Sequence, residues 1–127
     1  MVVGNKSANL AATVEVRQHK VVSGLSEQNG GLDEGPNPHE LVEAALSACT
    51  ILTCELYAQR KKMKLTNTFA SVKIISETKE GAVIQRVLKF EGDLTQEDRD
   101  KLVEIADKCP IHRLLEGKIE IQTTVTV

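Results

Sequence analysis

Aromatic residues are scarce in this sequence, which contains no Trp, one Tyr and two Phe among 127 residues. Few side chains are therefore available to stack on nucleic-acid bases. The 16 Lys and Arg residues are balanced by 18 Asp and Glu residues, which gives a formal net charge of −2. Because a polyanion is normally bound by an excess of positive charge, we expect no nucleic acid among the partners of this protein.

Long apolar runs are also lacking. No stretch approaches the roughly 18 consecutive apolar residues that a membrane-spanning helix needs. The first ten residues, MVVGNKSANL, contain neither a basic leader nor the apolar core of a signal peptide. We therefore expect a cytoplasmic protein with no membrane partner, and the chain length predicts a single domain over residues 1–127.

Cysteine occurs three times, as Cys49, Cys54 and Cys109. An odd number of cysteines in a reducing compartment argues against a structural disulfide framework. The three thiols are therefore inert core residues, metal ligands or redox-active groups. Motifs for a serine nucleophile, a phosphate-binding loop or a dinucleotide site are absent from the sequence.

The N-terminal part of the chain predicts strands followed by a loop. Residues 10–22, LAATVEVRQHKVV, place β-branched residues on either side of a polar segment, which predicts two short antiparallel strands joined by a turn. Residues 26–38 gather Gly, Asn, Asp and Pro, a composition typical of an exposed loop. We therefore expect a β-hairpin and a loop before the first long helix.

That helix has a clear start signal. Asn37 can cap it, Pro38 suits the first helical position, and Glu40 lies where a capping box places its acidic residue. The following Ala- and Leu-rich stretch has no Gly or Pro as far as about Lys62. Its apolar residues cover most of the helix circumference, which is typical of a buried helix.

The length of this helix indicates a dimer. About 25 residues of helix span roughly 37 Å, whereas a compact domain of this size has a radius of gyration of about 14 Å. The helix should therefore be buried by more than its own chain. We predict a homodimer in which the two copies share this helix.

The second half of the chain predicts two strands, two helices and a final strand. Gly81 supplies the turn between the strands, Thr95 or Asp93 caps the next helix, and Gly117 ends the last one. The segments expected are residues 69–77, 83–92, 95–108, 110–116 and 118–127. The order ββαββααβ predicts an α+β fold in which antiparallel strands pack against two main helices.

Cys49 and Cys54 both lie within the long helix. Cys49 is surrounded by small and apolar residues in AALSACTIL, and this segment alone favours an ordinary core thiol. Cys54 points about 140° away from Cys49 around the helix axis. The two cannot pair within one helix, so we assign Cys54 to packing.

Cys109 precedes Pro110 at an expected helix start, where free backbone N–H groups and the helix dipole stabilise a thiolate. His112 and Arg113 add positive potential nearby. The residues support equally well an interpretation in which Cys109 only caps the helix and both basic side chains lie in solvent.

A zinc site is the other alternative for these residues. Cys109 and His112 have C-x-x-H spacing, and His39 and Cys49 could complete four ligands. Zinc sites usually have closely spaced ligand pairs in both halves, and Cys49 has no second ligand three or four residues away. We therefore predict no metal and no cofactor.

Two segments together resemble the OsmC/Ohr family of osmotically inducible protein C and organic hydroperoxide resistance proteins. They are GPNPHELVEAALSACT, residues 35–50, and CPIHRLLEG, residues 109–117. The resemblance extends to the element order and covers nearly the whole chain. It implies an OsmC-like fold, an intertwined homodimer with active sites at the interface, and reduction of organic hydroperoxides with recycling by a dithiol.

The resemblance also implies roles for two thiols. Cys49 is similar to the peroxidatic cysteine, which attacks the terminal oxygen of a hydroperoxide and becomes a sulfenic acid. Cys109 is similar to the resolving cysteine, which condenses with it to a disulfide. An alternative is an OsmC-like binding or redox-sensing protein that has an apolar thiol pocket and little turnover.

The family further places an arginine from the N-terminal strands over the reactive thiolate, held by a glutamate directly after an Asn-Pro pair. By this resemblance Arg17 is the candidate cation. Here His39 follows the Asn-Pro pair and Glu40 comes next, so both residues are candidates for the supporting position.

Overall fold

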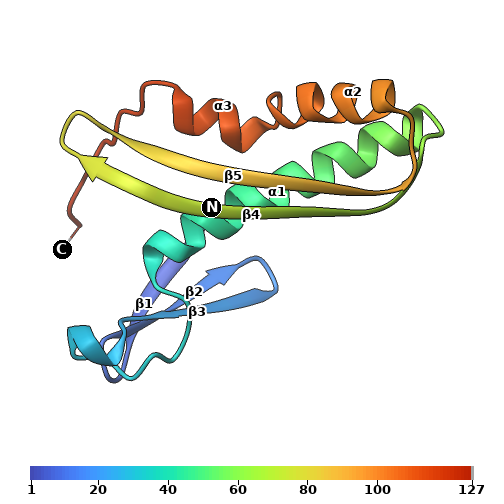
Figure 1. Ribbon diagram of the computed structural model, residues 1–127. Coiled ribbons are helices and arrows are strands. Elements are labelled where there is room, and N and C mark those ends of the chain that lie inside the picture. The colour runs from blue at the N-terminus through green and yellow to red at the C-terminus, as the bar shows by residue number, and fades with distance from the viewer. Residues whose placement is uncertain (127) are drawn as a thin grey trace. The chain divides into compact units, whose positions relative to one another are not determined.

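The computed structural model describes residues 1–126 and forms two compact units, Met1–Ala44 and Ala45–Val127. It has the predicted α+β character, with antiparallel strands and helices (Figure 1). In chain order the elements are β1 (Val3–Ser7), β2 (Ala11–Val16), β3 (His19–Gly24), the 3-10 helix η1 (Glu27–Asn29), α1 (Pro38–Arg60), β4 (Lys64–Thr78), β5 (Gly81–Asp93), α2 (Gln96–Ala106) and α3 (Pro110–Glu116).

The N-terminal unit contains an antiparallel sheet of order β1-β2-β3. Its β2–β3 hairpin confirms the hairpin predicted from the sequence, with Val16 opposite His19. Strand β1 was not predicted, because its sequence VGNKS lacks the alternation of a half-buried strand. It forms as an edge strand on β2, where the hydroxyls of Ser7 and Thr13 hydrogen-bond at 2.7 Å.

The entry into α1 confirms the predicted capping box. The Asn37 side chain accepts a hydrogen bond from the Glu40 backbone N–H at 2.8 Å, and Glu40 Oε1 accepts one from the Asn37 N–H at 2.9 Å. The preceding Gly35 lies against β3, where a Cβ would overlap the carbonyl of Val22. Ser23 of the same strand donates a hydrogen bond to the Pro36 carbonyl at 2.8 Å. The loop is therefore fixed to the sheet before the helix begins.

Helix α1 buries one stripe of side chains rather than its whole circumference. The buried residues recur every four positions and are Leu46, Thr50, Cys54 and Ala58. Leu52 and Leu56 remain exposed in the single chain. The sequence-based expectation of burial on nearly all sides is therefore not met within one protomer, because the chain supplies packing partners for only one face.

By length and composition alone, α1 is apolar enough to cross a membrane. Its polar contacts nevertheless join it to the C-terminal unit. Ser47 donates a hydrogen bond to the Ala70 carbonyl of β4 at 2.7 Å, and Glu55 accepts one from the Thr68 hydroxyl at 3.0 Å. These contacts attach one face of α1 to strand β4.

The C-terminal unit is organised along the long β4–β5 hairpin (Figure 1). Both strands are longer than predicted and pair from Lys64↔Asp93 to Thr78↔Gly81. Side chains of α1, β5 and α2 form the core: Cys54, Ala58, Phe90, Leu102 and Ala106. Helix α2 begins at the predicted cap Thr95, whose side chain accepts from the Asp98 N–H in a capping box.

Two predictions for this unit were wrong, one about the end of a helix and one about a strand. Helix α2 ends at Ala106 rather than near Lys108, and residues 107–108 form a turn before Cys109. The final strand predicted over residues 118–127 is not formed at 118–126, and Val127 lies outside the described residues. Alternation makes a strand only where a neighbouring strand supplies hydrogen bonds, and within the described residues this segment pairs with none.

Candidate active site

The two thiols singled out by the sequence lie next to each other. Cys49 is half-buried on α1, and Cys109 is fully buried at the N-cap of α3. The Cys109 side chain is close enough to Cys49 to lower the pKa of that thiol, and its sulfur accepts the His112 backbone N–H at 3.3 Å. Cys109 therefore caps α3 and also lies beside Cys49 in the middle of α1. The sequence had left open whether Cys109 caps the helix or takes part in chemistry, and this position is compatible with both.

The surroundings of Cys49 favour its thiolate. Burial raises the pKa of the thiol, but hydrogen bonds from the Ile111 backbone and from the Cys109 and Thr53 side chains outweigh this effect and lower the pKa below its ordinary value. The Thr53 hydroxyl lies 3.9 Å from Cys49 Sγ. Because the thiolate is the nucleophilic form of cysteine, this environment makes Cys49 the reactive thiol of the pair.

Cys54 has the opposite character. It is fully buried in the core, and its thiol points to the Leu102 carbonyl at 3.6 Å. Burial raises its pKa to about 11, although the positive charge of Arg86 acts in the other direction. Cys54 is therefore a packing residue, as predicted.

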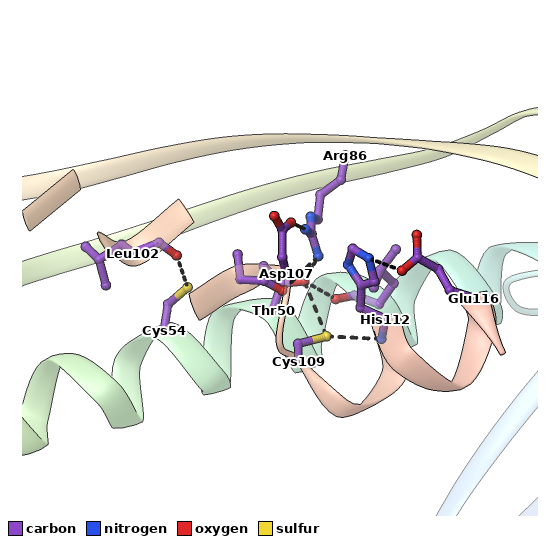
Figure 2. A network of polar contacts seen from close by, with 10 residues as sticks. Thr50, Cys54, Arg86, Leu102, Asp107, Cys109, His112 and Glu116 are labelled. Atoms are coloured by element: carbon purple, nitrogen blue, oxygen red, sulfur yellow. Dashed lines mark hydrogen bonds and ion pairs between the residues drawn. The ribbon is translucent and has the colours of Figure 1, made fainter. Parts of the chain in front are cut away.

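A buried arginine that the sequence analysis did not select completes the site. Arg86 extends from β5 toward α1 and the α2–α3 junction (Figure 2), and its side chain is 11% exposed. One guanidinium nitrogen donates to the Thr50 hydroxyl at 3.1 Å and to the Ala106 carbonyl at 3.3 Å. The other donates to Asp107 Oδ1 at 2.9 Å.

One signal in the sequence could have identified this arginine. Arg86 occupies the same alternation register as Ile84, Leu88 and Phe90, which are the less exposed residues of β5. A charged residue at an inward position of a strand needs polar partners. The partners, Thr50 and Asp107, were not recognisable because they lie on other elements.

The other predicted site residues belong to the N-terminal unit. Arg17 is exposed in the β2–β3 turn with a φ of 55°. His39 is exposed in the first turn of α1, and Glu40 holds the capping box. Their roles toward Cys49 therefore stay predictions.

A cleft of about 770 Å³ opens beside the thiol site. This volume is within the usual range for small-molecule sites. Cys49 itself is not among the lining residues. The wall combines apolar with charged and polar side chains, among them Leu46, Ile84, Leu115, Glu80, Arg86, His112 and Glu116. His112 Nε2 lies 2.8 Å from Glu116 Oε1.

The zinc alternative has no support in this geometry. Within residues 1–126, no three or more His, Cys, Asp or Glu side chains gather in a way that could hold a metal ion. Cys109 instead receives hydrogen bonds, and the His112 ring faces Glu116.

Comparison with known proteins agrees with the fold. A family model described as OsmC-like protein matches residues 31–124. An OsmC-like protein from Mycoplasma pneumoniae superposes with a TM-score of 0.77 at 15% identity, covering 92% of this chain and 86% of that one. No curated protein matches the sequence.

Two further solved structures carry functional names. An organic hydroperoxide resistance protein from Elizabethkingia anophelis has a TM-score of 0.72 at 23% identity, covering 94% of this chain and 89% of that one. A Legionella pneumophila protein named organic hydroperoxide resistance protein OsmC has a TM-score of 0.68 at 21% identity, covering 92% and 88%. These structures share the fold, and the family model confirms the resemblance found in the sequence. The chain therefore belongs to the OsmC-like protein family.

Proposed function

We propose that this protein is a cysteine-based peroxidase that reduces organic hydroperoxides to alcohols. The observation that carries the proposal is the proximity of Cys109 to Cys49, whose pKa is lowered; the neighbouring Thr50 hydroxyl lies 3.9 Å from Cys109 Sγ. Two proteins of the same fold are named organic hydroperoxide resistance proteins, which supports this assignment.

The proposed reaction has three balanced steps. The Cys49 thiolate attacks the terminal peroxide oxygen, the O–O bond breaks, and the alkoxide takes a proton to leave as an alcohol. Cys49 is then a sulfenic acid, which the Cys109 thiol attacks to form a disulfide and release water. A dithiol reductant returns both cysteines to thiols and becomes a disulfide itself.

The cleft beside the site supports an organic rather than an inorganic peroxide. Its wall includes Leu46, Ile84 and Leu115, and apolar burial contributes about 25 cal/mol per Å². Hydrogen peroxide has no tail to bury there. We further propose that the enzyme works as a homodimer in the cytoplasm, where reduced dithiols are available.

Serine variants of the three cysteines test this function. We expect Cys49→Ser to abolish consumption of cumene hydroperoxide in a dithiol-coupled assay, because the proposed nucleophile is lost. Cys109→Ser should react once and then accumulate sulfinic acid at Cys49 under excess peroxide, as measured by intact mass. Cys54→Ser is the matched control, which should lose stability but keep turnover because its thiol takes no part in the reaction.

The outcome also decides between the two functions that the sequence left open. Retained turnover in Cys49→Ser would contradict the proposed mechanism. If wild-type protein consumes cumene hydroperoxide no faster than Cys49→Ser does, the alternative of an OsmC-like binding or redox-sensing protein replaces the peroxidase.

A further inference from the structure

Arg86 connects three elements of the fold close to Cys109. It originates on β5, donates to the Thr50 hydroxyl on α1, and donates to Ala106 and Asp107 at the end of α2. Only two residues separate Ala106 from Cys109. The guanidinium is therefore the shared anchor of the segment that positions Cys109 (Figure 2).

Two of these acceptors, the Ala106 carbonyl and the Asp107 carboxylate, place negative charge at the C-terminal end of α2. The Ala106 carbonyl belongs to the last turn of α2, and it accepts the Cys109 N–H at 3.2 Å as well as the Arg86 guanidinium. Asp107 caps the same helix end, and a carboxylate there is unfavourable against the negative end of the helix dipole. Arg86 neutralises both, and its planar fork can serve several acceptors at once.

The contact with Thr50 links this anchor directly to the thiols. Thr50 follows Cys49 on α1 and is fully buried. Its hydroxyl lies 2.7 Å from the Leu46 carbonyl and 3.9 Å from Cys109 Sγ. Because Arg86 donates to the Thr50 oxygen, the hydroxyl hydrogen is left to point to either of these acceptors.

We propose that Arg86 is a positioning residue for formation of the Cys49–Cys109 disulfide. It holds the α2–α3 junction against α1, so that Cys109 Sγ stays within reach of the Cys49 sulfur. In the peroxide cycle, where this inference rests on the proposed function, the Cys109 thiolate attacks the sulfenic sulfur. The S–S bond forms, the S–O bond breaks, and the released hydroxide takes a proton to become water.

The first test measures disulfide formation without any peroxide. The protein is equilibrated with mixtures of reduced and oxidised dithiothreitol, and the Cys49–Cys109 disulfide is quantified by mass spectrometry. We expect Arg86→Lys to lower the effective concentration of the thiol pair about tenfold, because an ammonium cannot replace the forked, charge-assisted hydrogen bonds. Asp107→Ala, which removes a more exposed partner, should lower it by about threefold.

Arg99 provides a matched control. It also reaches between α2 and β5, where it donates to the Phe90 carbonyl at 2.7 Å, but it lies at the other end of α2. Arg99→Lys should leave the effective concentration within about twofold of wild type. An equal loss in Arg86→Lys and Arg99→Lys would reveal a general packing effect and overturn the inference.

The second test separates the disulfide step from the attack on peroxide. In a Cys109→Ser background, the effect of Arg86→Lys on the rate of the first peroxide reaction is measured as the reference, because Arg86 also lines the cleft beside the thiols. With Cys109 present, the same substitution should lengthen the lifetime of the Cys49 sulfenic acid about tenfold, as measured by trapping with dimedone. An unchanged lifetime in a folded variant would overturn the inference.

Failure of the proposed function would be seen separately. Wild-type protein could fail to consume hydroperoxides and yet form the disulfide with oxidised dithiothreitol in an Arg86-dependent way. This result would contradict the peroxidase function and support the positioning role of Arg86. If Arg86→Lys does not fold, Asp107→Ala decides, and an unchanged disulfide equilibrium in that folded variant contradicts the inference.

Discussion

At the scale of single residues, the three cysteines show how strongly the surroundings of a thiol determine its chemistry. Cys49 and Cys54 lie on the same helix, yet the pKa of Cys49 is lowered and that of Cys54 is raised to about 11. The difference comes from hydrogen-bond donors. Cys49 accepts from Ile111, Cys109 and Thr53, whereas the Cys54 thiol itself points to a carbonyl.

This difference predicts the pH dependence of the first reaction step. The thiolate fraction of Cys49 rises as pH increases through its pKa, so the rate with cumene hydroperoxide should rise with pH and level off above that pKa. Because the pKa is lowered, the midpoint should lie below that of the same cysteine in the unfolded chain. Stopped-flow measurements across pH 5 to 10 would give the midpoint.

The Cys109→Ser variant adds a control for the cause of this shift. A serine hydroxyl is a different donor from the thiol, so the midpoint should move if the Cys109 hydrogen bond contributes to the lowered pKa. The Cys54→Ser variant should not move it. A wild-type midpoint at or above that of free cysteine would contradict the assignment of Cys49 as the activated thiol.

At the scale of elements, the start of α1 shows a residue with two candidate roles. The family resemblance makes Glu40, beside His39, a candidate support for an activating arginine, while the structure uses the Glu40 carboxylate in the capping box with Asn37. A capping box accepts Gln as well as Glu at this position. Structural and chemical roles of Glu40 can therefore be separated by substitution.

We expect Asn37→Ala to lower the free energy of unfolding by about 1 kcal/mol, because the side-chain cap is lost. Glu40→Gln should change it by only a few tenths of a kcal/mol, since the amide oxygen can still accept the Asn37 N–H. Chemical denaturation of both variants would measure this, with Thr95→Ala as the equivalent cap deletion in α2. A loss of peroxide reduction in a fully stable Glu40→Gln would assign the charge of Glu40 a role beyond capping.

At the scale of the whole molecule, two apolar features are left without partners in the single chain. Leu52 and Leu56 on α1 are 67% and 49% exposed. The alternating segment 118–126 exposes Ile119, Ile121 and Val125 and forms no strand in the described chain. A large exposed apolar surface is typical of an interaction site, and both features support the homodimer proposed from the length of α1.

Sedimentation at micromolar concentration should therefore detect a dimer. Leu52→Glu combined with Leu56→Glu should shift the protein toward monomer, because burying two carboxylates in an apolar interface is strongly unfavourable. Val103→Glu is the control, since Val103 is similarly exposed but lies on α2. A folded wild-type monomer at this concentration would contradict the dimer.

Much of the local structure could be predicted from the sequence alone. The start of α1, the cap at Thr95 and the helix beginning after Cys109 all follow from interactions between residues three or four positions apart. The β2–β3 and β4–β5 hairpins follow from alternation and short turns. These features depend on neighbours in the chain, so the sequence carries their signals directly.

The residues of the candidate active site could be predicted only in part from the sequence. Cys49 and Cys109 were paired by a family resemblance, because the residues themselves left several roles open for each thiol. Arg86 has partners that are 36 and 21 residues away in the chain, and no local pattern indicates which buried acceptors a strand arginine will meet. The strand predicted at 118–126 also depends on distant residues, because it needs a neighbouring strand to supply hydrogen bonds. Hydrogen bonds between distant segments depend on how the elements pack, so only the tertiary structure decided them.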